Sequence, residues 1–166
     1  DVYKRQFLIC PDNTIHQALA HVLPQSPRPW LHIAEEVAAE AAARGYRRIG
    51  ILGTRWLVDS GVYPDKLAAE GLDHVRPGQE DRDALARIIM DELVYGVFKP
   101  ESVARLQAII GNLRDAGCDA VVLGCTELPL VLNDGNSALP TLDSTRILAR
   151  AALTRALQPP DARQPR

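Results

Sequence analysis

The chain has 166 residues, of which 46% are hydrophobic and 24% are charged, and its formal net charge is −2. This composition is typical of a folded globular protein and excludes a disordered or fibrous chain. Because there is no excess of positive charge, neither nucleic acid nor an anionic membrane is expected as a partner.

The cysteines and the start of the chain bear on its cellular compartment. Cys10, Cys118 and Cys125 show no Cys-x-x-Cys spacing and form no even disulfide set, which is typical of a reducing compartment. No apolar stretch of about 18 residues and no secretory signal peptide is visible, so we expect a cytoplasmic protein without membrane insertion. The sequence lacks an initiating Met and runs almost at once into the apolar segment 7–10. We therefore expect an N-terminally truncated chain.

Short apolar strands are predicted to alternate with amphipathic helices along the chain. In chain order, the expected strands are residues 7–10, 49–54, 72–75, 120–123 and 139–142. The expected helices are residues 15–22, 31–44, 57–70, 80–95, 100–117, a short helix ending near 132, and 145–157. This alternation predicts an α/β fold with a mainly parallel sheet. In such folds, sites form beyond the carboxyl ends of the strands.

The first predicted strand ends in a turn made of capping residues. Pro11-Asp12-Asn13-Thr14 follows strand 7–10, and Asp, Asn and Thr begin turns and cap helices through their side-chain oxygens. Three prolines between residues 24 and 29 then interrupt regular structure. They predict a crossing point between two lobes.

A cysteine occupies the corresponding turn after strand 120–123. In Gly124-Cys125-Thr126-Glu127 the thiol lies at a strand-to-helix turn, where free backbone N–H groups favour a thiolate. We therefore expect the pKa of Cys125 to lie below its ordinary value of about 8.5. The same N–H groups can bind a carboxylate. The alternative is that Cys125 is a small buried hydrophobic residue.

The two turns together resemble the aspartate/glutamate racemase superfamily. Its members pair a Cys-Asn-Thr turn in one lobe with a Gly-Cys-Thr turn in a second, pseudo-symmetric lobe, and Gly-Cys-Thr-Glu is similar to the aspartate racemase branch. The likeness extends over residues 7–157. It includes Gly53-Thr54, Ser60, Tyr63, the run 92–96 and Asp143-Ser144-Thr145.

The resemblance implies an α/β fold of two pseudo-symmetric lobes with mainly parallel sheets flanked by helices, the first lobe being incomplete. On this plan, residues 1–30 and 141–158 form the remainder of the N-terminal lobe, 31–140 form the second lobe, and 159–166 form a frayed tail. Family members begin with roughly two more strand–helix units of about 30 residues each, which agrees with truncation. Because the family tends to dimerise, a second copy of the chain is an expected partner.

The chemistry implied by the resemblance needs no cofactor. One thiolate removes the α-proton of a small acidic amino acid, and an acid on the opposite face returns a proton. Cys125 is then one acid/base group. The residues expected to bind the substrate are Asn13, Thr14, Thr54, Thr126, Glu127 and His16, whereas Ser60 and Tyr63 are assigned to capping and packing. The histidines show no metal-ligand spacing, so no metal site is expected.

Asp12 stands where the family has its first catalytic cysteine. A carboxylate with the ordinary pKa of about 3.9 is a weak base toward carbon, and it serves only if burial or a nearby thiolate raises that pKa. Three functions stay open: a racemase with Asp12 as the second acid/base group, an arylmalonate-type decarboxylase that uses Cys125 alone, and a non-catalytic protein that binds an acidic metabolite. A cysteine hydrolase would need a histidine beside Cys125.

Overall fold

The computed structural model describes residues 6–158, and the predicted frayed tail lies outside these described residues. Four parallel strands form one sheet in the order β2-β1-β3-β4. The strands are β1 (Arg48–Leu52), β2 (Asp73–Val75), β3 (Ala120–Leu123) and β4 (Thr141–Asp143). The α-helices are α1 (Leu19–Val22), α2 (Ile33–Ala43), α3 (Arg55–Val58), α4 (Val62–Ala69), α5 (Gln79–Asp91), α6 (Pro100–Asp115) and α7 (Ser144–Leu157). Short 3₁₀ helices are η2 (Thr14–Ala18), η3 (Leu23–Gln25), η4 (Leu93–Tyr95) and η5 (Leu128–Leu130).

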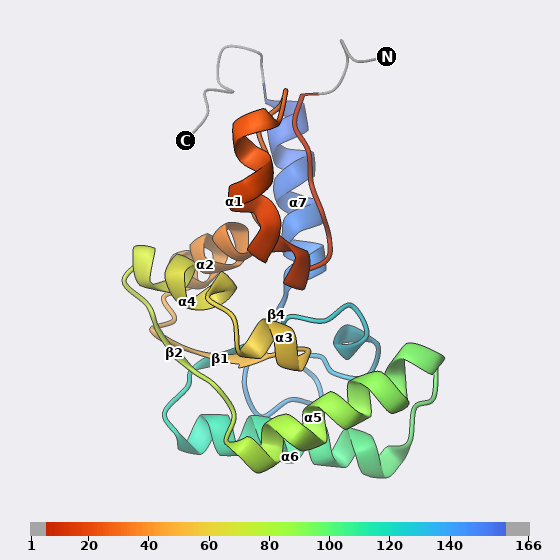
Figure 1. Cartoon of the computed structure of the whole chain (residues 1–166). Helices are drawn as coiled ribbons and strands as arrows, with labels where there is room; N and C mark the ends of the chain where they lie inside the picture. Colours follow the sequence, from red (N-terminus) through yellow and green to blue (C-terminus); the bar gives the residue numbers. More distant parts are fainter. Residues whose placement is uncertain (1–5, 159–166) are drawn as a thin grey trace.

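Helices cover both faces of the sheet (Figure 1). Alternate residues of the two central strands point to opposite faces, as the pleat requires. Ile51 and Val122 face a core built with α2 and α4, while Leu52 and Val121 face a core built with α5 and α6. Both central strands are therefore buried on each side, which is typical of parallel sheets. The predicted α/β fold is confirmed.

The expected helix 15–22 begins as the 3₁₀ helix η2, and the expected helix 80–95 ends at Asp91 and is followed by η4. Three other expected elements also differ from the structure. Residues 7–10 form no strand: Leu8 makes one bridge with Trp30, beside Pro29, which has no N–H to continue a ladder. The expected helix 57–70 is divided into α3 and α4. Ser60 causes the break, because its hydroxyl donates to the carbonyl of Leu57 at 2.7 Å and accepts from the N–H of Val62 at 3.2 Å.

The third difference concerns the segment after Cys125. Instead of the expected α-helix it forms only η5, a single 3₁₀ turn. Short 3₁₀ turns offer fewer aligned backbone dipoles than an α-helix. This segment therefore stabilises a thiolate at Cys125 less than the expected α-helix would.

The first and last segments lie side by side. Helix α7 packs against α2, and Phe7 and Ala152 pack against one cluster of buried residues. Leu148 of α7 is buried with Leu31 and Ile33, which anchors α7 at the start of α2. Strand β4, placed in the N-terminal lobe by the expected division, pairs with β3 and so belongs to the same sheet as β1. The division into two lobes stays a prediction. No helix of residues 6–158 is long and apolar enough to cross a membrane.

Candidate active site

The two turns singled out in the sequence meet at one cavity. Asp12 and Cys125 are 113 positions apart, yet both line the same cavity of about 200 Å³. Strands β1 and β3 are parallel neighbours, so the residues that follow them, Thr54 and Cys125, lie at the same edge of the sheet. The cavity is lined by Asp12, Asn13, Thr14, Thr54, Ile89, Met90, Val94, Gly124, Cys125, Thr126 and Glu127.

Gly124 allows the Cys125 turn to approach the end of β1 closely. Its N–H donates to the carbonyl of Leu52 at 2.8 Å. A Cβ atom at position 124 would lie only 2.7 Å from that same oxygen and 2.5 Å from Leu57. A side chain here would push the turn away from β1, so glycine sets the position of Cys125.

The Cys125 thiol is protonated at neutral pH, contrary to the expectation from its turn. Burial raises the pKa of Cys125 to about 12, and the hydrogen bond to Glu127 and the negative charges of Glu127 and Asp12 act in the same direction. Its Sγ donates to Glu127 Oε2 at 2.8 Å. Burial removes the water that would solvate a thiolate, and this effect exceeds that of the few backbone N–H groups at the turn.

Glu127 is the carboxylate that receives the thiol hydrogen bond. Burial alone would raise its pKa, but hydrogen bonds from the Cys125 thiol and the Thr126 hydroxyl hold the pKa of Glu127 below its ordinary value. Thr126 Oγ1 donates to the same Oε2 atom at 2.8 Å. Glu127 is therefore ionised, and its carboxylate holds the neighbouring thiol in the neutral, proton-donating form.

Asp12 also lines the cavity and is exposed. Its Oδ1 accepts from the N–H of Ile15 at 2.9 Å, which caps the first turn of η2. Its charge contributes to the raised pKa of Cys125. The charge of Asp12 therefore opposes formation of a thiolate at Cys125.

A buried hydrogen-bond network holds the two turns relative to each other. The hydroxyl of Tyr63 donates to Asn13 Oδ1 at 2.5 Å, and Asn13 Nδ2 donates to Ser144 Oγ at 3.0 Å. Ser144 Oγ in turn donates to the carbonyl of Leu123 at 2.9 Å, two residues before Cys125. Tyr63 and Ser144 are fully buried and Asn13 is 3% exposed. This role of Tyr63 and Ser144 is not visible in the sequence, because nothing local to either residue indicates a partner 50 or 131 positions away.

Removing the Tyr63 hydroxyl should destabilise the fold. In Tyr63→Phe, Asn13 Oδ1 loses its donor inside the protein, and a buried unpaired acceptor costs about 1–3 kcal/mol. Urea denaturation should show a lower free energy of unfolding by this amount. Tyr95 is 77% exposed, so Tyr95→Phe is the matched control and should change stability by less than about 0.5 kcal/mol. Equal effects of the two substitutions would contradict the network's role.

Of the predicted site residues, His16 alone does not line the cavity. Its Nε2 accepts from the N–H of Ile33 at 3.3 Å, so Nδ1 carries the proton and donates to the carbonyl of Asp12 at 2.8 Å. His16 thereby ties the first turn to the start of α2. Thr14 and Thr54 do reach the cavity, with their hydroxyl oxygens 3.2 Å apart. The proposed contact of His16 with substrate stays a prediction.

Two histidines that accept hydrogen bonds from the first residues of α2, His16 and His32, should make the free energy of unfolding depend on pH. His32 Nδ1 accepts from the N–H of Ala34 at 3.2 Å, and its ring lies 4.6 Å from that of His16. Burial, with the neighbouring His16 and Lys66, lowers the pKa of His32 to about 4, and burial also lowers the pKa of His16. Protonation would place a hydrogen on His16 Nε2 and on His32 Nδ1. Each nitrogen would then be a donor facing a backbone N–H group.

The free energy of unfolding is therefore expected to fall as the pH falls from 6.5 to 4. In this window the unfolded chain binds a proton at His32 that the folded chain does not, so acid favours unfolding, whereas above pH 6.5 this contribution is complete. The expected loss is on the order of 2 kcal/mol, because His32 is only partly buried. Chemical denaturation across this pH range measures it. His32→Asn, which keeps a capping side chain, should lose most of this dependence, and His21→Asn, at an exposed position, should retain it.

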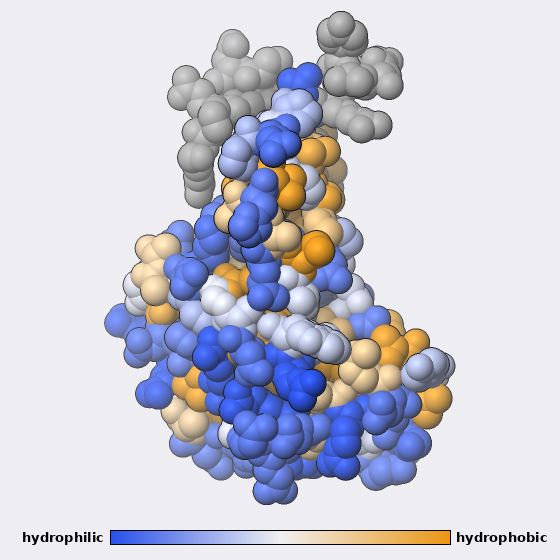
Figure 2. All heavy atoms as spheres, in the orientation of Figure 1, coloured by the Kyte–Doolittle hydropathy of each residue, from blue (hydrophilic) through white to orange (hydrophobic). Residues whose placement is uncertain are grey.

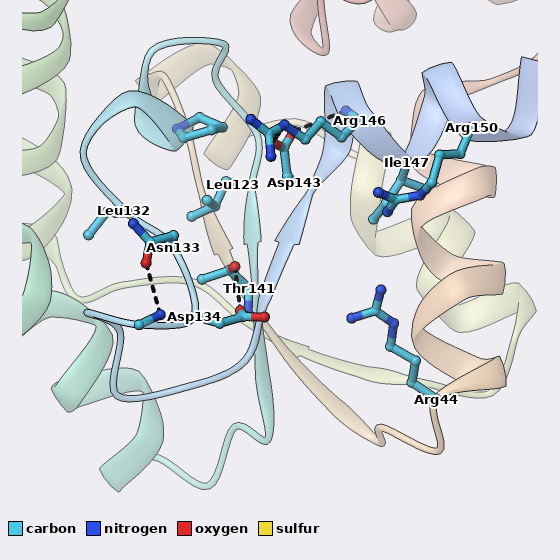
Figure 3. Close-up of a pocket in the computed structure, with 12 residues that line it drawn as sticks. Arg44, Leu123, Leu132, Asn133, Asp134, Thr141, Asp143, Arg146, Ile147 and Arg150 are labelled. Carbon is cyan, nitrogen blue, oxygen red and sulfur yellow. Dashed lines mark hydrogen bonds and ion pairs between the residues drawn. The ribbon is translucent and has the colours of Figure 1, made fainter.

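A second hollow, of about 340 Å³, lies beside β4 and contains none of the predicted site residues. Figure 3 shows Arg44, Arg146 and Arg150 around it, reaching from α2 and α7. Arg44 pairs with Glu40 at 2.5 Å and Arg146 with Asp143 at 3.3 Å. Carboxylates thus balance two of its three arginines, and we assign this hollow no role. In the described part of the chain, no group of three His, Cys, Asp or Glu side chains is arranged to hold a metal ion.

The comparisons with known proteins agree with this geometry. The family model described as Asp/Glu/hydantoin racemase matches residues 5–152. The chain is 24% identical over 151 residues to the broad specificity amino-acid racemase RacX of Bacillus subtilis, which covers 89% of this chain and 63% of RacX. The chain therefore spans less than two thirds of the length of RacX.

Solved structures give the same result. An aspartate racemase homologue from Pyrococcus horikoshii is 31% identical, with a TM-score of 0.82 over 92% of this chain and 67% of that one. The aspartate racemase of Picrophilus torridus shares the fold, with a TM-score of 0.72 and 22% identity over 91% of this chain and 62% of that one. The resemblance seen in the two turns is thereby confirmed, and the chain belongs to the Asp/Glu/hydantoin racemase family.

Proposed function

We propose that this chain acts as a cofactor-independent amino-acid racemase in which Cys125 and Asp12 are the two acid/base groups. The observation that carries the proposal is that both side chains line one small cavity although they lie in separate turns. Racemisation requires one group to remove the α-proton and another to deliver a proton to the opposite face. The volume of about 200 Å³ suits a ligand smaller than a drug molecule.

The protonation state of Cys125 indicates which proton transfers Cys125 and Asp12 would each perform. With a pKa of about 12, Cys125 rests as a thiol and is ready to donate a proton to a planar carbanion. Asp12 would then remove the α-proton from the other face, a role that requires the bound substrate to cover its exposed carboxylate and so make it a stronger base. In the opposite direction Cys125 must first lose its proton, and the carboxylate of Glu127, whose Oε2 lies 2.8 Å from Sγ, opposes formation of the thiolate. The two enantiomers would therefore react at unequal rates.

Polar groups around Asp12 and Cys125 would hold the α-carboxylate. Thr14 and Thr54 bring hydroxyl groups to the cavity, and Asn13 keeps one amide hydrogen beyond the one given to Ser144. Donors placed in advance stabilise negative charge that moves onto the carboxylate as the α-proton leaves. The acidic amino acid implied by the resemblance, the homodimer and the cytoplasmic location stay predictions.

Exchange of the α-proton tests this function directly. Each enantiomer of a panel of amino acids is incubated with the protein in heavy water without added cofactor, and deuterium at the α-carbon is followed by NMR. Exchange accompanied by appearance of the other enantiomer is the expected result. A protein that binds these amino acids but exchanges no α-proton would refute the racemase function.

The resting thiol also favours one alternative. A decarboxylase of the arylmalonate type needs a single proton donor to quench the enolate that remains after loss of carbon dioxide, and a thiol that is protonated at neutral pH meets this need. Release of carbon dioxide from an aryl malonate, without exchange of any amino-acid α-proton, would identify this function. Among the described residues no histidine lines the cavity, so a cysteine hydrolase receives no support.

A further inference from the structure

One wall of the Cys125 cavity is apolar. It consists of Ile89 and Met90 from α5 and Val94 from η4. Ile89 is buried, whereas Met90 is 39% and Val94 47% exposed. Figure 2 shows hydrophobic surface over this end of α5 and the segment after it. Apolar side chains open to a cavity lose hydration when an apolar group of a ligand covers them.

The charged groups of the cavity are all negative. Of the residues that line it, Asp12 and Glu127 carry carboxylates, and no Lys, Arg or His from residues 6–158 lines it. Hydrogen bonds keep the pKa of Glu127 below its ordinary value, so this carboxylate stays charged. Such a site attracts the α-ammonium group of an amino acid but repels a second carboxylate on its side chain.

Arginines of the described residues line other hollows. Arg55 and Arg87 belong to a neighbouring hollow of about 270 Å³, and Met90 lines both that hollow and the Cys125 cavity. The arginines of Figure 3 lie beside β4, in a hollow that shares no lining residue with the Cys125 cavity. In the described residues, therefore, no cation is placed to bind a side-chain carboxylate near Cys125.

We propose that this site takes an α-amino acid with an uncharged, apolar side chain rather than aspartate or glutamate. The side chain lies against Ile89, Met90 and Val94, and the α-ammonium group faces the carboxylates of Asp12 and Glu127. The α-carbon then lies between Asp12 and Cys125. This inference rests on the proposed racemase function and specifies the substrate class for the same cavity.

The test compares methionine, aspartate and lysine in the heavy-water exchange assay with the unmodified chain. The expected kcat/KM for α-proton exchange is at least about tenfold higher for methionine than for aspartate, because like charges oppose binding of the latter. Faster exchange with aspartate or with lysine would overturn the side-chain class and leave the racemase function standing. Absence of exchange with every amino acid would end both proposals.

Two variants make the electrostatic argument specific. Met90→Arg places a cation on the apolar wall at a partly exposed position, so it should raise the aspartate-to-methionine ratio of kcat/KM by at least about tenfold. Leu153→Arg adds the same charge at a 60% exposed position that does not line the cavity, so this control should leave that ratio within about twofold of the unmodified chain. Arg87→Ala should not change exchange with aspartate. If Arg87→Ala lowers aspartate exchange selectively, an arginine of the neighbouring hollow already serves acidic substrates, and the proposal is wrong.

Discussion

Replacement of Cys125 by serine is expected to lower the rate of α-proton exchange by about 10²–10⁴-fold, the usual contribution of a positioned acid/base group. Serine keeps a donor for Glu127, which accepts the thiol hydrogen bond at 2.8 Å. Serine also fits the position of Cys125, which is buried with 8% of its surface exposed. The fold should therefore persist while the proton chemistry is lost, because a hydroxyl gives up its proton far less readily than a thiol.

The control for this substitution is another cysteine. Cys10 is partly buried and does not line the cavity, so Cys10→Ser should retain the exchange rate. Circular dichroism of both variants checks that the fold is intact. Retention of the full rate by a folded Cys125→Ser variant would remove Cys125 from the mechanism and with it the racemase proposal.

The second large effect is expected at Asp12. Asp12→Asn should lower racemisation by about 10²–10⁴-fold, because an amide cannot transfer the proton. An Asn side chain can still accept from the N–H of Ile15, as Asp12 Oδ1 does at 2.9 Å, so the turn should keep its shape. Exchange by Cys125 needs only one face of the substrate. The enantiomer whose α-hydrogen faces Cys125 should therefore still take up deuterium, with retention of configuration.

Exchange without inversion in this variant would show that Asp12 transfers a proton and does not merely bind the substrate. Loss of both reactions in Asp12→Asn, with substrate affinity also lost, would assign Asp12 to binding instead of proton transfer. Asp12→Cys gives the two-thiol arrangement that the sequence resemblance implies and should racemise faster than Asp12→Asn. Chiral chromatography measures inversion and NMR measures deuterium uptake in the same samples. Inversion at the unmodified rate in Asp12→Asn would show that another group acts on that face.

The elements near the site could be predicted where the signal is local. The Ala- and Glu-rich run of α2 and the apolar stripe of α6 carry their helix preference in neighbouring residues. Strand β3 is a continuous apolar run, as expected for a strand covered on both faces. The division of residues 57–70 was missed, because the hydroxyl of Ser60 competes with the helix through two hydrogen bonds that a propensity argument does not contain.

The sequence by itself determined the α/β fold, the turns at Asp12 and Cys125, and their likeness to one family, because hydrophobic periodicity and turn residues act between near neighbours in the chain. Only the tertiary structure decided that these segments share one cavity and that Tyr63 and Ser144 connect them. It also reversed the expected pKa of Cys125, since burial and the position of Glu127 follow from packing. Solvent exposure and hydrogen bonds between distant residues exist only once the chain has folded, so no local pattern encodes them.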